Sequence, residues 1–165
     1  AKAGKPTRSF VGMQVAHLGI AIFVIGVTMV GAYQEEKDVR MSAGETVSVG
    51  GYQIQLQDVN LVPGPNYQAM RGTFLLSKNG NTQTTLYPEK RNYFSSTMPM
   101  TEAAIDAGLT RDIYVSLGEA LPDQSWAVRV YYKPFVDWIW GGCLLMALGG
   151  VLAISDKRYR IQSKR

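Results

Sequence analysis

The sequence has one cysteine and one histidine among its 165 residues. Cys143 has no partner within the chain, so the fold is held without disulfides. There is no Cys-x-x-Cys-His segment, which excludes a c-type cytochrome. The sequence also lacks a nucleophile with a histidine base, a phosphate-binding glycine loop and a cluster of metal ligands. Nothing in it therefore indicates an autonomous active site.

Charge is absent from two long stretches, residues 9–34 and 138–155. Runs of this length match the roughly 20 apolar residues that a helix needs to cross about 30 Å of hydrocarbon. We predict transmembrane helices at residues 10–33 and 135–155, which argues against a purely soluble enzyme. A cleaved signal peptide would have a shorter apolar core than the first stretch, which continues into Tyr33.

Positive charge gathers at the two ends of the chain. The arm of residues 1–9 contains Lys2, Lys5 and Arg8, and the tail of residues 156–165 contains five more basic residues. Basic segments next to membrane spans stay in the cytoplasm, so both ends are predicted to be cytoplasmic. The domain of residues 34–134 then faces the periplasm of a bacterial inner membrane.

The central domain accounts for none of the basic character of the chain. Residues 33–134 contain nine basic and eleven acidic residues, so the isoelectric point of about 9.2 comes from the two ends. This distribution removes the main support for nucleic-acid binding.

The domain reads mainly as β-strands. Residues 52–57 alternate apolar and polar side chains, and residues 126–132 do the same. Residues 73–78 and 82–87 flank Asn79-Gly80, a dipeptide that suits the positive φ angles of a tight hairpin turn. We predict that these last two segments pair antiparallel.

One short helix is expected at residues 102–107. Thr101 is placed to cap it, and Gly108 can end it. The predicted fold is therefore a membrane protein in which two transmembrane α-helices flank a mainly β periplasmic domain with one short helix.

Small residues repeat along the first span. Gly12, Gly19 and Gly26 follow one another at seven-residue intervals. A stripe of this kind lets another helix approach closely within a membrane. We predict that the first helix has helical neighbours.

His17 lies within the first span, about 10 Å from Phe10 along a helix. An imidazole at that depth needs a hydrogen-bond partner, a cavity or a metal. Three roles stay open: a hydrogen bond to a backbone carbonyl or to Gln14 of a neighbouring chain, ligation of a metal or haem iron, or proton relay. A six-coordinate haem would need a second ligand, and the chain has no second histidine.

Lys90 and Arg91 form a basic cluster between Tyr87 and Tyr93. They could bind carboxylates such as haem propionates, or an acidic partner surface. They could equally be the solvated end of a strand, because exposed charges contribute little.

Five segments, in order along nearly the whole chain, closely resemble the C-terminal part of the CcmF family, the membrane haem lyase subunit of bacterial cytochrome c maturation. The segments are residues 12–19, 36–41, 86–91, 100–106 and 131–140.

The resemblance implies that such a chain works where haem is attached to the Cys-x-x-Cys-His thiols of apocytochrome c. The family takes haem from the periplasmic chaperone CcmE and receives apocytochrome through a thioredoxin-like CcmH-type subunit. It also holds a b-type haem in the membrane, thought to reduce the incoming haem. His17 matches one of the two membrane histidines that ligate this haem.

The sequence departs from the family where its larger N-terminal portion would be. The tryptophan-rich motif, the pair of periplasmic histidines and the other membrane histidine are absent. We therefore expect a C-terminal fragment or a separately encoded part, not catalytic by itself. It would pack the glycine face of its first helix against spans of the N-terminal portion or other membrane subunits.

An alternative function keeps the membrane anchor and removes the cofactor. In that hypothesis the chain is a docking module for maturation partners, and His17 makes only a packing hydrogen bond.

Overall fold

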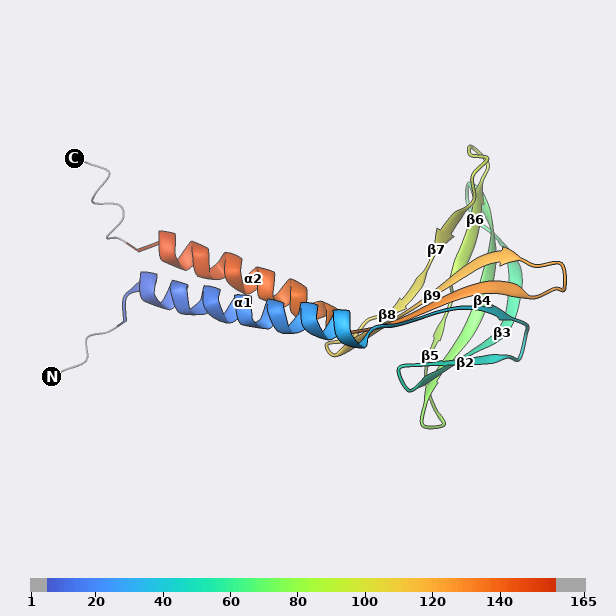
Figure 1. Ribbon diagram of the computed structural model, residues 1–165. Helices are drawn as coiled ribbons and strands as arrows, with labels where there is room; N and C mark the ends of the chain where they lie inside the picture. Colours follow the sequence, from blue (N-terminus) through green and yellow to red (C-terminus); the bar gives the residue numbers. More distant parts are fainter. Residues whose placement is uncertain (1–5, 157–165) are drawn as a thin grey trace. The chain divides into compact units, whose positions relative to one another are not determined.

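The computed structural model describes residues 6–156 as two units, a pair of helices and the β domain of residues 33–134. Helix α1 spans Arg8–Tyr33 and helix α2 spans Val136–Ile154. Figure 1 shows the two helices side by side and running in opposite directions. The basic residues at positions 2, 5 and 157–165 lie outside the described residues.

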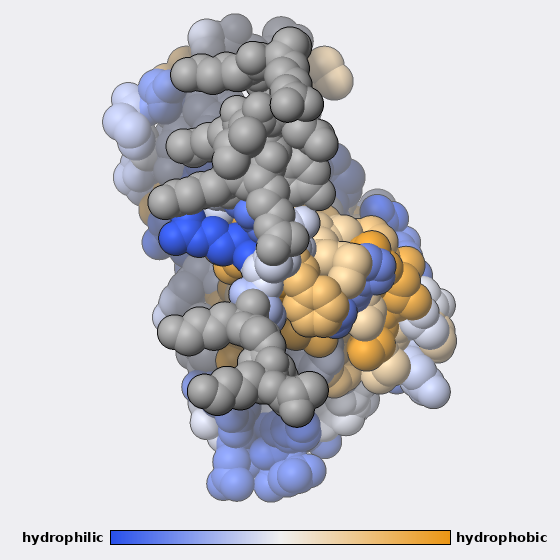
Figure 2. Space-filling model, turned by 90° about the vertical axis from the view of Figure 1, so that its left-hand side faces the viewer, coloured by the Kyte–Doolittle hydropathy of each residue, from blue (hydrophilic) through white to orange (hydrophobic). Residues whose placement is uncertain are grey.

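Both helices are long and apolar enough to cross a bilayer. They have 26 and 19 residues, with mean hydropathies of 2.2 and 1.6 over their most apolar windows. Figure 2 shows the apolar side chains gathered over the helix pair. Most large side chains exposed on the helices are apolar, including Phe10, Leu18, Val24, Trp140, Leu144 and Val151. Such a surface is stable against lipid and not against water.

The helices pack through glycine. Gly12, Gly19 and Gly26 are buried in α1, and Gly142 and Gly149, also seven residues apart, are buried in α2. The predicted helical neighbour exists, but the expectation that it would be a span of another subunit is wrong. Helix α2 of the same chain occupies the glycine face, because its own glycines match the spacing of those in α1.

The approach of the two backbones leaves no room for a side chain at these positions. A methyl group added at Gly149 would lie 2.5 Å from the amide nitrogen of Ala16, and one added at Gly19 would lie 2.7 Å from that of Met146. At Gly150, one residue further along α2, an added methyl group would meet nothing within 4 Å.

The beginning of α1 is capped from two places in the sequence. Thr7 Oγ1 accepts a hydrogen bond from the amide of Phe10 at 3.2 Å, and Asp156 Oδ2 accepts one from the amide of Ser9 at 3.0 Å. The first amides of a helix have no partner within it and favour a negative charge nearby. Asp156, buried just beyond α2, therefore stabilises α1.

The β domain consists of two antiparallel sheets. One has the strand order β1-β10-β9-β8; the other has the order β2-β3-β4-β6-β7, with β5 also paired to β4. The strands are β1 (Glu35–Met41), β2 (Thr46–Val49), β3 (Tyr52–Pro63), β4 (Tyr67–Lys78), β5 (Asn81–Leu86), β6 (Glu89–Tyr93), β7 (Met100–Glu102), β8 (Ala104–Asp106), β9 (Arg111–Ala120) and β10 (Trp126–Pro134).

The hairpin prediction is confirmed. Strands β4 and β5 pair antiparallel, and the turn between them has φ angles of 52° at Asn79 and 78° at Gly80. The alternating segments 52–57 and 126–132 also lie in strands, β3 and β10, which extend beyond them.

The short helix predicted at residues 102–107 is wrong. This segment contributes to β7, which pairs with β6, and to β8, which pairs with β9. The chain therefore passes from one sheet to the other between Glu102 and Ala104. Pairing with two strands distant in the sequence satisfies the backbone, and this outweighs the local capping signals of Thr101 and Gly108.

The core lies between the two sheets. It is formed by inward side chains from both sheets, with Phe74, Ile54, Leu76, Ile113, Val115, Leu117 and Val130 fully buried. Polar side-chain contacts also link strands of different sheets, and Lys90 and Lys37 make two of them. Lys90 of β6 forms an ion pair with Glu119 of β9, and Lys37 of β1 donates a hydrogen bond to the carbonyl of Ser48 in β2.

Glu89 is the buried carboxylate of the domain, with an exposed fraction of 5%. Its Oε1 lies 2.5 Å from Nη2 of Arg71, and its Oε2 lies 2.7 Å from Nε of Arg91. Burial by itself would raise the pKa of this carboxyl, but the hydrogen bonds from Arg91 and Arg71 lower it overall.

We predict that acid destabilises the domain through Glu89. A carboxyl whose pKa is lower in the folded state stabilises the fold above its unfolded pKa, near 4.5, and loses that contribution as the pH falls through the folded value. Glu89→Gln is expected to lower the free energy of unfolding by about 2 kcal/mol at pH 7 and to weaken the acid dependence. Thermal unfolding at pH 3–7 measures both effects. Glu119→Gln is the control, because Glu119 also forms an ion pair but is exposed. An equal loss of unfolding free energy in this variant would contradict the prediction.

We also predict that Gly149→Ala separates the helices and that Gly150→Ala does not. The first substitution forces a methyl group against the backbone of α1, whereas the second points into open space. Energy transfer between labels on the two helices, followed during titration with a denaturing detergent, should show earlier separation for Gly149→Ala alone. Identical curves for the two variants would show that the glycine contact does not hold the pair.

Candidate functional site

His17 lies on the side of α1 turned away from α2. It precedes Gly19 by two residues, which places it about 160° around the helix from that glycine. It is exposed, as are Gln14, Ala21 and Thr28, which share its side of the helix. The side of α1 that carries His17, Gln14 and Thr28 is therefore free of α2.

The imidazole is oriented by its own helix. Nδ1 of His17 lies 2.7 Å from the carbonyl oxygen of Met13, one turn earlier. A carbonyl can only accept, so Nδ1 donates this hydrogen bond and Nε2 keeps a lone pair. Within residues 6–156, Nε2 meets no hydrogen-bonding group.

This arrangement suits a metal ligand. Histidines that bind metals usually donate the second ring N–H to a carbonyl or carboxylate, which fixes the tautomer and the orientation of the ring. His17 has that bond, and it lies on the exposed side of α1. The described residues hold no group of three metal-ligating side chains, and the sequence offers no second histidine. A haem bound here would need its second axial ligand from elsewhere.

Lys90 and Arg91 lie next to each other on β6, and both are paired within the domain. Lys90 contacts Glu119. Nε of Arg91 lies 2.7 Å from Glu89 and its Nη1 lies 3.3 Å from Glu102, which makes it a bridge between β6 and β7. The hydrogen bond to Glu89 raises the pKa of Arg91. Contact of these cations with propionates or an acidic partner stays a prediction.

A groove that sequence reasoning missed lies on the outer face of the first sheet, with a volume of about 460 Å³. Its small side chains come from β9 and β10, at Ser116, Gly118 and Ala127. Charged residues of β1 and β10 border it. Arg129 holds Asp38 through two hydrogen bonds of 2.6 and 2.8 Å, and hydrogen bonding by Arg129 lowers the pKa of the Asp38 carboxyl.

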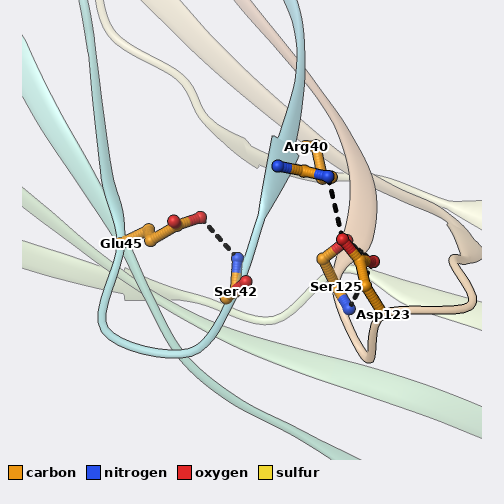
Figure 3. Close-up of polar contacts among 5 residues, drawn as sticks. All are labelled: Arg40, Ser42, Glu45, Asp123 and Ser125. Carbon is orange, nitrogen blue, oxygen red and sulfur yellow. Dashed lines mark hydrogen bonds and ion pairs between the residues drawn. The ribbon is translucent and has the colours of Figure 1, made fainter.

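A polar cluster near the groove positions the loop between β9 and β10 (Figure 3). Nη1 of Arg40, a groove residue, lies 2.8 Å from Asp123, and the Ser125 hydroxyl donates to the same carboxylate at 2.5 Å. The Ser125 bond lowers the pKa of Asp123. In the neighbouring turn, Glu45 accepts a hydrogen bond from the Ser42 amide at 2.7 Å.

Comparison with known proteins agrees with this architecture. The family model for the CcmF C-terminal β-sandwich matches residues 32–134. The cytochrome c-type biogenesis protein CcmF of Pseudomonas aeruginosa is 52% identical over 158 residues, 96% of this chain and 24% of the relative. CcmF of Escherichia coli K12 is 49% identical over 156 residues, 94% of this chain and 24% of the relative.

A solved structure shares the fold. The cytochrome c haem lyase CcmF aligns with a TM-score of 0.72 at 19% identity, over 90% of this chain and 25% of that protein. The chain thus spans about a quarter of the length of the relatives it matches. With the family's β-sandwich at its centre and close relatives aligned along nearly all of it, the chain belongs to the CcmF family of cytochrome c biogenesis and corresponds to its C-terminal part.

Proposed function

We propose that this chain is the C-terminal portion of a haem lyase, in which His17 is one axial ligand of a b-type haem in the bacterial inner membrane. The observation that carries the proposal is His17 on the side of α1 opposite the glycine contact with α2, with its Nδ1 bonded to the carbonyl of Met13. The similarity to a cytochrome c biogenesis protein and to a haem lyase supports the same chemistry.

The residues of this chain would orient and protect the ligand. Met13 keeps the imidazole in the tautomer that can bind iron. A haem bound at His17 would supply an electron for reducing the haem that is to be attached. The second axial ligand would come from the N-terminal portion of the lyase or from another membrane subunit.

The β domain would face the periplasm and form one wall of the site where haem is joined to the Cys-x-x-Cys-His thiols of apocytochrome c. Its partners in this role would be the chaperone CcmE, a CcmH-type subunit and the apocytochrome itself. The domain suits a wall because its two sheets share one core and the buried Glu89 of β6 forms an ion pair with Arg71 of β4.

The test is His17→Ala in the complete assembly. Removing an axial ligand is expected to lower b-haem content by on the order of tenfold or to shift its absorption, and to lower the yield of cytochrome c. Reduced-minus-oxidised spectra of the purified assembly measure the first effect. In His17→Gly, added imidazole should restore part of the haem signal.

Thr28→Val is the matched control, because Thr28 is exposed on the same side of α1 and lies eleven residues further along. It should leave the spectrum unchanged. Normal haem content in a correctly inserted His17→Ala assembly would refute ligation by His17.

A second function, docking of a maturation partner, is favoured by the groove on the outer face of the first sheet. Ser116→Trp would fill this groove, and Ser48→Trp on β2 provides a control on an exposed site outside it. We expect Ser116→Trp alone to reduce co-purification of the CcmH-type subunit several-fold, while the b-haem spectrum is retained. Equal co-purification of both variants would exclude the groove as the docking site.

A further inference from the structure

A cationic cluster surrounds the hydroxyl group of Tyr52, the first residue of β3. The side chain is nearly buried, and its oxygen accepts hydrogen bonds from Nε of Arg111 at 3.0 Å and from Nζ of Lys78 at 3.3 Å. The two cations also lie against the ring, 4.5 Å and 4.9 Å from its centroid for Lys78 and Arg111. Three elements, β3, β4 and β9, thus bring two positive charges to one oxygen.

More donors meet at this cluster than acceptors. Nη1 of Arg111 contacts the carboxylate of Asp106 at 2.5 Å and its carbonyl at 2.7 Å, which accounts for one end of the guanidinium. Among the described residues, no acceptor faces Nη2 of Arg111, the two remaining hydrogens of Lys78 or the hydroxyl hydrogen of Tyr52. One carboxylate also leaves one positive charge unbalanced.

The two cations also change the acidity of the Tyr52 hydroxyl group. Burial by itself would raise the pKa of Tyr52, but the hydrogen bonds from Arg111 and Lys78 lower it overall. The surroundings of this oxygen therefore favour a negative charge.

The cluster lies at the end of the domain where the chain leaves for the apolar helices. Arg111 pairs with Pro134, the last residue of β10, and the Tyr52 ring packs 6.3 Å from the ring of Tyr132. Pro134 precedes Val136, the first residue of α2, by two positions, so their Cα atoms can lie at most about 7 Å apart. Leu109, in the turn before Arg111, has 78% of its surface exposed.

We propose that Lys78, Tyr52 and Arg111 bind the phosphate group of an anionic phospholipid at the bilayer surface. The three side chains supply converging donors for phosphate oxygens, and the exposed Leu109 adds apolar contact for the acyl end of the same molecule. An exposed leucine beside a cationic cluster can strengthen the binding of a lipid through its acyl chain, but it cannot strengthen the binding of a free anion. The site depends on the helices spanning a membrane and not on haem.

The test uses the full chain in a neutral detergent, titrated with a short-chain phosphatidylglycerol, with the matching phosphatidylcholine or with inorganic phosphate. Native mass spectrometry counts bound lipid, and thermal unfolding of the β domain gives an apparent affinity. Phosphatidylglycerol should bind and stabilise, whereas the other two should do so far less.

Lys78→Ala should weaken phosphatidylglycerol binding about three- to tenfold, the effect of one lost charge-assisted hydrogen bond at an exposed site. Lys78→Gln, which keeps a polar side chain, should behave alike. Arg40→Ala is the matched control, because it removes one exposed cation that lies outside the cluster, beside the groove. Leu109→Ser should weaken lipid binding and leave phosphate binding unchanged.

Equal stabilisation by inorganic phosphate would overturn the assignment to lipid. Equal losses in Lys78→Ala and Arg40→Ala would reduce the effect to net charge and overturn the site. Unchanged lipid binding in folded Lys78→Ala, checked by circular dichroism, would do the same.

Discussion

The contact between the glycine stripes of α1 and α2 determines what the helix pair can present to its surroundings. Gly12 and Gly19 meet Gly149 and Gly142 at backbone distance, so no larger residue fits there. Packing Gly12, Gly19 and Gly26 against α2 leaves the opposite side of α1 outside this contact. His17 is thereby held on the outward side, where a further membrane segment or a cofactor can reach it.

The two sheets of the β domain are held together without disulfide bonds. The consecutive strands β7 and β8 belong to different sheets, so one continuous segment of the chain joins both sheets. Glu89, with Arg71 and Arg91, ties β4 to β6, and Arg91 continues the network to Glu102 in β7. A domain of about one hundred residues can be stabilised by a core and ion pairs of this kind without any disulfide bond.

The sequence predicts features that depend on neighbours along the chain. The Asn79-Gly80 turn and the apolar spans belong to this class, as does the spacing of Gly12, Gly19 and Gly26. Their signals are local, because a positive φ angle, a long uncharged run and a helical stripe can each be read from one segment.

Features that depend on strands far apart could not be predicted in this way. Residues 102–107 carry helical capping signals, but their pairing with β6 and β9 decides their structure. The groove requires β1, β9 and β10 to be in register, and the charge around Tyr52 requires β3, β4 and β9 to meet. The hydrogen bond from His17 to the carbonyl of Met13 could not be predicted either, because any residue at position 13 has a carbonyl group.

The hydrogen bond from Ser9 to Asp156 has a consequence for biogenesis. A membrane chain is made and inserted from its N-terminus, and this carboxylate is synthesised only after α2. The hydrogen bond from Ser9 to Asp156 therefore forms only after the β domain and α2 have been synthesised. Synthesis of α2 and Asp156 thus supplies the carboxylate that stabilises the beginning of α1.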